Sequence, residues 1–473
     1  AIASAANQAT GVTSGQSLTT AATGITINNS VGQIITLNTG GTYTVVDDSS
    51  PGYSIVTPGT EATLLKLKFT GTTEDVKIMK VGFQFASAAT NTPVDLVGQK
   101  VTLWDGTTQV GEALFVNNGD YATSTLSGTF TVPAGSSKTM TVKGTVNTIN
   151  STAGPLTNSG DLIVMAWDAQ NVNSGTPVSG GNYGTGVQGG TSIAVSSTAD
   201  VTPTGVRVMR AYPKFEKIDL STSERLLQTG TNKVLYKFKV TAMSGPVAFA
   251  KFTFQHSSST GTNTRATTSK YAMYVYTDAF TTPDSTFQST TAGDNGTDGL
   301  LNSGSCYGNE NGQPVANTVG IAGSGIEITL DKSATACAAT GHTAFSTTTL
   351  TIPSGATRWF EVRGSVNGTA AGVSGSGVES QTGTESIDTQ INGDVAYPTV
   401  IPNPQGVSGS FASAGFTMGK YAAIEIDTND DLIWSPLSTT TTADLAALDW
   451  TNAYQLSGLP GVSMAAETLT SAN

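Results

Sequence analysis

The sequence predicts an all-β protein made of tandem immunoglobulin-like β-sandwich domains, with extra N-terminal strands and a C-terminal segment of mixed β and irregular structure. Three observations predict this fold class. Charged residues make up only 12% of the chain, and Thr, Ser, Asn and Gly replace them. Apolar runs of strand length are separated by clusters of Gly, Pro, Asn and Ser. Two of these patterns also occur twice along the chain.

The first repeat is a pair of alternating segments. Residues 65–70 read LKLKFT and residues 236–241 read YKFKVT, an offset of 236 − 65 = 171. In both, apolar side chains fall on one face and lysines on the other, as in a half-buried strand. A second apolar run follows each at the same distance, Val76–Phe83 and Val247–Phe254.

The second repeat is a strand, a turn and another strand. Residues 129–135 read TFTVPAG and residues 349–355 read TLTIPSG, an offset of 349 − 129 = 220. Proline followed two residues later by glycine indicates a turn between the strands. Because the two offsets differ by 220 − 171 = 49 residues, the second copy must carry an insertion, which we place at about residues 256–348.

These repeats define the expected domains. Residues 1–52 form a flexible start with N-terminal strands, and residues 53–200 form the first sandwich. Residues 201–420 form the second sandwich with its insertion, and residues 421–473 form a separate C-terminal segment. Apart from Ala443–Leu448, no segment shows a helical period.

Charge and hydropathy limit the partners. The formal net charge is −12 and the sequence pI is about 4.6, so the surface repels nucleic-acid phosphates and is compatible with divalent cations. No run approaches the roughly 18 apolar residues of a membrane span. The chain starts at Ala1, which indicates that an export leader has been removed. We therefore expect an extracellular location on a cell surface, without nucleic acid and without a membrane span.

The two cysteines, Cys306 and Cys337, lie in the predicted insertion. A local pair in an exported protein predicts a disulfide that pins this insertion. The alternative is two free buried thiols.

Calcium is the one cofactor that the sequence suggests. Asp427, Asn429, Asp430 and Asp431 form the densest group of oxygen ligands, although the glycine and distal glutamate of an EF-hand are absent. A solvated acidic turn is the alternative. Asp294 and Asp298 are a second, weaker candidate site.

Motifs for catalysis are weak. Residues 184–189 read GTGVQG, but this dinucleotide fingerprint lies in a Gly/Ser loop before another strand-like run, where no helix can face a pyrophosphate. The two histidines, His256 and His342, lie among small polar residues, and we expect both to be exposed. Acidic residues fall in turns. We therefore predict no enzyme activity and no organic cofactor.

The tryptophans Trp104, Trp167 and Trp359 lie inside alternating runs, which favours core or cross-strand packing. Sugar-binding aromatic platforms are the alternative. Trp434 and Trp450 belong to the C-terminal segment.

The N-terminal region carries the candidate assembly residues Ile25, Ile27, Ile34, Ile35 and Leu37. They are apolar enough to add as a strand to a sheet edge of a neighbouring subunit. The alternative is that they pair within their own first sandwich.

The C-terminal segment reads DLIWSPL at residues 431–437, DWTN at residues 449–452 and GLP at residues 458–460. This ending resembles that of S-layer-like surface proteins of Candidate Phyla Radiation (Patescibacteria) bacteria, as does the strand LYKFKVTA at residues 235–242, introduced by Tyr212-Pro213. The resemblance implies an exported, immunoglobulin-like protein that forms lattices or filaments. This chain is shorter, and it shows no helical anchoring region or sorting motif.

We therefore expect a self-assembling extracellular structural protein, either an S-layer lattice subunit or a surface filament subunit. Its main partner would be itself, as a homo-oligomer, and a second partner would be cell-envelope polysaccharide. The alternatives are an adhesin or carbohydrate-binding module, and the non-catalytic part of a secreted hydrolase.

Overall fold

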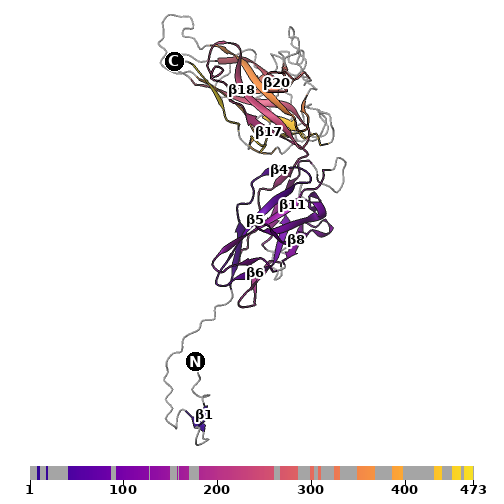
Figure 1. Ribbon diagram of the computed structural model, residues 1–473, viewed down its shortest axis with the longest axis vertical. Helices are drawn as coiled ribbons and strands as arrows, with labels where there is room; N and C mark the ends of the chain where they lie inside the picture. The colour runs from indigo at the N-terminus through magenta and orange to yellow at the C-terminus, as the bar shows by residue number, and fades with distance from the viewer. Residues whose placement is uncertain are drawn as a thin grey trace.

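The computed structural model describes most of two sandwiches, and the prediction of an all-β fold is confirmed. The described residues are 8–10, 17–19, 41–86, 92–126, 128–149, 157, 159–169, 181–259, 267–285, 299–302, 307–309, 324–330, 349–367, 386–397, 431–438, 450–459 and 463–471. The first sandwich spans the described residues of 41–208 and the second those of 209–471, and they lie end to end along the long axis (Figure 1). A separate hairpin pairs β1 (Gln8–Thr10) with β2 (Ser17–Thr19).

The first sandwich contains two main sheets. The five-stranded sheet has the order β3-β5-β11-β7-β8, and the six-stranded sheet is built around β6, which pairs with β9, β10, β13 and β14. The strand bounds are β3 Tyr43–Asp47, β5 Glu61–Gly71, β6 Val76–Phe85, β7 Lys100–Asp105, β8 Thr108–Leu114, β9 Tyr121–Thr125, β10 Thr131–Val132, β11 Ser137–Thr145, β13 Met165–Trp167, β14 Tyr183–Gly186 and β15 Ser192–Ala194. Short 3₁₀ turns lie at Pro93–Asp95, Val97–Gln99 and Val116–Asn118.

The second sandwich repeats this plan. One sheet has the order β17-β18-β24-β20, and the other is built around β19, which pairs with β22, β23, β25 and β26. The bounds are β17 Tyr212–Lys217, β18 Gly230–Met243, β19 Val247–Ser259, β20 Thr267–Tyr276, β21 Tyr307–Asn309, β22 Ser324–Thr329, β23 Leu350–Ile352, β24 Thr357–Asn367, β25 Ser386–Ile391, β26 Leu432–Ser435, β27 Thr451–Asn452 and β28 Glu467–Thr470.

The internal repeat seen in the sequence is confirmed down to the strand register. Val132 pairs with Val76 in the first sandwich. Ile352 corresponds to Val132 by the offset of 220 and Val247 corresponds to Val76 by the offset of 171, and these two residues pair in the second sandwich. Met140 pairs with Leu67, and likewise Phe360 pairs with Phe238. Equal patterns of alternation therefore produce equal pairing, because a slip of one residue would turn the buried face outward.

The Pro-x-Gly turns also match. Gly135 and Gly355 both have positive φ, at 67° and 71°, where glycine is not strained. The Gly135 N–H donates to the Gly71 carbonyl at 3.0 Å, and the Gly355 N–H donates to the Ala242 carbonyl at 2.9 Å. This turn is therefore built in the same way in both copies.

Each sandwich has its own core. In the first, Leu67, Phe69, Phe83 and Trp167 are at most 1% exposed. In the second, the Phe238 and Phe360 rings stack with centroids 4.8 Å apart. Burial of such side chains contributes about 1.5–3 kcal/mol each, and this burial is the main force that holds each sandwich together.

Two expected segments at the ends belong to the sandwiches. β3, within the predicted segment 1–52, hydrogen-bonds to β5 as a strand of the first sandwich. β26 pairs with β19 and β28 pairs with β25, so the described part of residues 421–473 completes the second sandwich and is not a separate unit. Trp434 and Trp450 are 0% and 1% exposed, and their burial explains why this segment packs against the core.

The predicted insertion at 256–348 is described only in part. β22 corresponds to β9, because Ile326 pairs with Phe254 as Ala122 pairs with Phe83. On the edge of β22 that faces away from β19, β21 adds a further strand. In the first sandwich, no described strand is hydrogen-bonded to the corresponding edge of β9.

Candidate functional site

The junction between the two sandwiches combines strand pairing, a buried arginine and aromatic rings. The strand that leaves the first sandwich, β16 (Val206–Val208), lies between β12 (Leu162–Ile163) and β4 (Ser54–Val56) in a small third sheet. It pairs antiparallel with β12 and parallel with β4. The connection between the sandwiches is therefore a paired strand, which fixes its direction.

Arg207 lies at the centre of this junction and is 7% exposed. Its Nε donates to the Tyr53 hydroxyl at 2.7 Å, and its Nη1 donates to the Gly160 carbonyl at 2.5 Å. Its guanidinium carbon lies 3.4 Å from the centre of the Tyr397 ring and 5.6 Å from that of Tyr53. Tyr397 belongs to the second sandwich, so one side chain fastens both.

Aromatic and apolar contacts extend the junction. Tyr53 and Tyr454 lie edge to face, with ring centroids 4.9 Å apart. Burial raises the pKa of the Tyr53 hydroxyl far above its usual value, although the neighbouring Arg207 opposes this shift. Ile55 packs against the core of the second sandwich, and Met209 is part of that core. The Met209 N–H donates to the Val56 carbonyl at 3.0 Å.

A further cation reaches across from the linker. Arg210 Nη1 donates to the Leu437 carbonyl, which follows the end of β26 in the second sandwich. Cation–π contacts contribute about 0.5–2 kcal/mol each, and buried hydrogen bonds to charged groups contribute about 1.5–3 kcal/mol. These contacts together join the two sandwiches.

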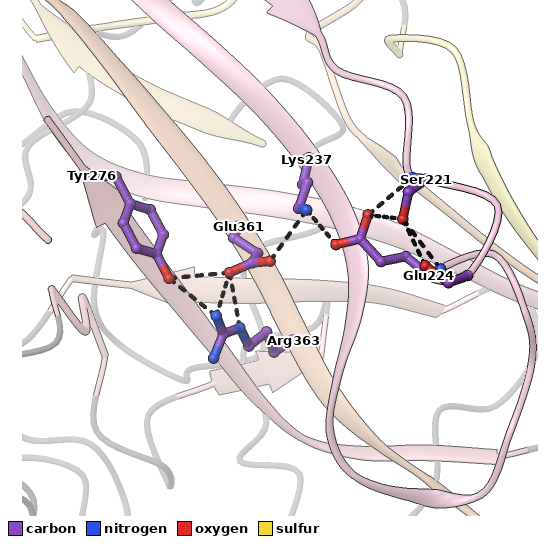
Figure 2. A network of polar contacts seen from close by, with 7 residues as sticks. Ser221, Glu224, Lys237, Tyr276, Glu361 and Arg363 are labelled. Atoms are coloured by element: carbon purple, nitrogen blue, oxygen red, sulfur yellow. Dashed lines mark hydrogen bonds and ion pairs between the residues drawn. The ribbon is translucent and has the colours of Figure 1, made fainter. Parts of the chain in front are cut away.

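The outward face of the second sandwich carries a polar network (Figure 2). Lys237 of β18 pairs with Glu224, and its Nζ lies 3.6 Å from Glu361 Oε1 on β24. The other Glu361 oxygen accepts from Arg363 Nε at 2.9 Å and from the Tyr276 hydroxyl at 3.1 Å. The charged and polar groups of these side chains bind one another, so the network joins β18, β24, β20 and the loop that contains Glu224.

The first sandwich lacks this network at the equivalent positions. Lys66 corresponds to Lys237 by the offset of 171, and Thr141 corresponds to Glu361 by the offset of 220. The two copies therefore share the register of their strands but not the chemistry of this face.

His256 is not exposed as expected: it is 1% exposed, and that prediction is wrong. Its Nε2 lies 2.7 Å from Thr268 Oγ1, and its Nδ1 lies 3.2 Å from Thr389 Oγ1. Burial lowers the pKa of the imidazole to about 4, so it is neutral at pH 7. The signal was present in the sequence, because His256 has the same period-2 phase as Phe252 and Phe254. His342 lies outside the described residues.

The glycine motif at residues 184–189 forms β14 and the turn to β15, and no helix follows it. The Gly189 N–H donates to Glu74 Oε2 at 3.0 Å, and the Gly41 N–H donates to Glu74 Oε1 at 2.9 Å. These backbone hydrogen bonds lower the pKa of Glu74. The turn thus binds a carboxylate of its own chain.

Most predicted site residues lie outside the described part of the chain. These are Cys306, Cys337, Asp294, Asp298, Asp427, Asn429, Asp430, Ile25, Ile27, Ile34, Ile35 and Leu37. The disulfide, both calcium sites and the assembly strand therefore stay predictions.

Asp431 is the one member of the acidic cluster that is described, and it is 7% exposed. Its N–H donates to Asp394 Oδ1 at 2.8 Å, and Asp394 Oδ2 accepts from the Ala453 N–H at 2.6 Å. Asp394, which the sequence analysis missed, thus fastens two C-terminal segments. Among the described residues, no three His, Cys, Asp or Glu side chains lie close enough to hold a metal ion.

The tryptophans are placed as packing residues. Trp167 is fully buried, with its Nε1 donating to Asn182 Oδ1 at 3.0 Å. Trp104 is half-buried on β7, and Lys143 Nζ lies 4.6 Å from the centre of its ring. Trp359 is half-buried on β24, paired with Lys239.

Comparisons with known proteins add little to these observations. No family model and no curated protein matches the chain. Among solved structures, it is similar to the major pilin subunit of Bacillus cereus at 13% identity and a TM-score of 0.18, over 45% of this chain and 47% of that one. It thus spans about half the length of that pilin.

Two other matches cover more of the chain. A serine-rich repeat adhesion glycoprotein of Streptococcus agalactiae matches at 10% identity and a TM-score of 0.15, over 74% of this chain and 91% of that one. A putative membrane anchored protein of Corynebacterium diphtheriae matches at 8% identity and a TM-score of 0.12, over 75% and 90%. TM-scores this low support no conclusion about function. Within the described ranges, no helix is long and apolar enough to span a membrane.

Proposed function

We propose that this chain is an exported structural protein of a microbial cell surface, which assembles with copies of itself into a filament or an S-layer-like lattice. The role is mechanical and not catalytic. The resemblance of the C-terminal sequence to S-layer-like proteins of Candidate Phyla Radiation bacteria supports this proposal, as does the low share of charged residues, 12%.

The observation that carries the proposal is the junction at Arg207. A flexible linker would let two sandwiches move independently, as interdomain contacts in a chain commonly allow. Here the linker is itself a strand in a sheet, and Arg207 binds Tyr53 on one side and stacks on Tyr397 on the other. Such a stiff, elongated unit is suited to an ordered array, because each copy presents its two ends at a constant spacing.

Assembly would proceed by addition of an N-terminal strand to a neighbour. Head-to-tail contacts of this kind do not close on themselves, so they propagate into a fibre or a sheet. Calcium is the proposed ion that orders the acidic C-terminal cluster.

The test is imaging of the purified protein by negative-stain electron microscopy over a range of concentrations, with calcium and with a chelator. We expect filaments or sheets with a regular repeat, and weaker order after chelation. Monomers under every condition, checked by light scattering, would contradict self-assembly.

The same images distinguish the form of the assembly. One axial repeat indicates a filament, and two repeats indicate a lattice. An adhesin would stay monomeric and bind an immobilised glycan, which a binding assay on cell-envelope polysaccharide would detect.

A further inference from the structure

The first and last segments of the first sandwich lie side by side and run in the same direction. Tyr43 pairs in parallel with Val195, and β4 pairs in parallel with β16, Ser54 with Val206 through Val56 with Val208. The separation is 195 − 43 = 152 at one end and 206 − 54 = 152 at the other. We name these two segments, residues 43–56 and 195–208, the parallel clamp.

Further hydrogen bonds reinforce the clamp at its two ends. Ser197 Oγ accepts from the Val45 N–H at 2.8 Å and donates to the Val45 carbonyl at 2.9 Å. The Ser196 N–H donates to the Tyr43 carbonyl at 2.9 Å. At the other end, Arg207 binds the Tyr53 hydroxyl at 2.7 Å. The clamp therefore has contacts at both of its ends.

The clamp lies on the path of any tension applied along the chain. Residues 43–56 follow directly from the start of the sandwich, and β16 leads into the second sandwich through Met209. Two parallel strands pulled from opposite ends slide past each other, so all the hydrogen bonds between them are loaded together. An antiparallel hairpin pulled from its two ends opens one bond at a time.

The second sandwich ends in a smaller contact of the same kind. Leu226 pairs in parallel with Thr470 of the last strand, and the Leu227 N–H donates to the Thr470 carbonyl at 2.8 Å. The buried Glu467 carboxylate binds Lys217 at 2.7 Å and Arg225 at 2.5 Å. The exit strand is therefore also fastened to the segment near the entry.

We infer that the parallel clamp resists mechanical force, which lets this protein withstand tension applied between its two ends. This inference rests on the proposed structural role, and it adds that the force on the protein acts along the chain. The Arg207 junction keeps the two sandwiches aligned, and the clamp keeps the first sandwich closed under the same pull.

The test is single-molecule force spectroscopy of the full chain held by its two ends. We expect a distinct high-force unfolding event for the first sandwich. In a second attachment, one handle is moved to the β7–β8 turn at residues 106–107. Pulling there peels β7 from β11, so the hydrogen bonds between these two strands are loaded in succession. We expect the high-force event to be lost in this geometry, which needs no change in the clamp.

Two matched variants give an independent check. Ser197→Ala removes the side chain that bridges Val45 across the clamp. Ser50→Ala, on the same segment 43–56, removes a side chain that bridges Lys66 of β5 at 2.9 Å and 3.2 Å, and so leaves the contacts with residues 195–208 unchanged. We expect Ser197→Ala to lower the unfolding force more than Ser50→Ala, although both lower stability in urea to a similar extent.

Equal forces in both pulling geometries, or equal loss in both variants, would overturn the inference. The result is separate from the proposed function. A chain that resists force but never assembles would contradict the surface-array proposal and leave the clamp in place. If the chains form an array but unfold at low force, the clamp inference is contradicted and the surface-array proposal is retained.

Discussion

The Arg207 guanidinium, on the strand that leaves the first sandwich, stacks on the Tyr397 ring of the second sandwich at 3.4 Å. The same guanidinium donates to Tyr53 and to the Gly160 carbonyl, both in the first sandwich. This side chain thus contacts both sandwiches at once.

Arg207→Ala should therefore loosen the junction more than it destabilises either core. The substitution removes contacts of about 0.5–2 kcal/mol for the cation–π stack and leaves the partly buried Gly160 carbonyl without this donor. We expect a larger spread of interdomain angles, seen as a broader pair-distance distribution in small-angle X-ray scattering. Lys68→Ala, on an exposed position of β5, is the control. An unchanged distribution in Arg207→Ala would show that the strand pairing of β16 alone sets the angle.

His256 should make the second sandwich sensitive to acid. Its pKa is about 4 in the folded protein and 6.5 for the ordinary group, so the unfolded chain binds a proton first as the pH falls. Stability is therefore lost between about pH 6.5 and pH 4, by about 3.5 kcal/mol at about 1.4 kcal/mol per pKa unit.

Urea unfolding at pH 7 and at pH 4.5 measures this effect. His256→Gln should lower stability at pH 7 but flatten the pH dependence in that window, whereas His342→Gln is the comparison for the other histidine. Equal slopes for His256→Gln and the unmodified protein would mean that the imidazole is not the group that titrates.

Cys306 and Cys337 should be joined by a disulfide. In the chain-entropy model a bridge over a loop of this size contributes roughly 3–4 kcal/mol. Because the predicted bridge lies in the insertion, its reduction should increase proteolysis there without unfolding the second sandwich. Mass spectrometry after alkylation of the native protein decides the matter: two labelled thiols would refute the disulfide.

The acidic cluster at residues 427–431 should bind calcium. A ligand that binds only the folded state raises its stability by mass action, about 2.7 kcal/mol at a hundredfold excess over Kd. We expect calcium to raise Tm, and replacement of Asp427 and Asp430 by Asn to reduce that rise. Replacement of Asp294 and Asp298 by Asn tests the second candidate site. A Tm indifferent to calcium and chelator in the unmodified protein would identify a solvated turn.

The N-terminal segment should drive assembly. Deletion of residues 1–38 leaves β3 and the rest of the first sandwich intact, since β3 begins at Tyr43. We expect a folded monomer that no longer forms filaments or sheets, measured by light scattering and electron microscopy. A synthetic peptide of residues 25–37 should bind to the truncated protein. Normal polymerisation of the truncated chain would exclude strand exchange.

Alternation along single strands carried most of what could be predicted from the sequence. Residues 65–70 and 236–241 established the two copies and their register, because the side-chain period of two assigns each residue to a face without reference to its neighbours. The paired Pro-x-Gly turns were equally local, since a φ near 70° at Gly135 and Gly355 favours glycine.

What the tertiary structure alone decided depends on residues distant in sequence. Nothing near Arg207 indicates that Tyr397 will lie against it, and nothing near Tyr43 indicates a partner at Val195. The phase of His256 along its own strand already indicated a buried position, but its partners Thr268 and Thr389 come from two other strands. Pairings of this kind are set by how whole sheets close over a core, and short-range propensity contains no information about that closure.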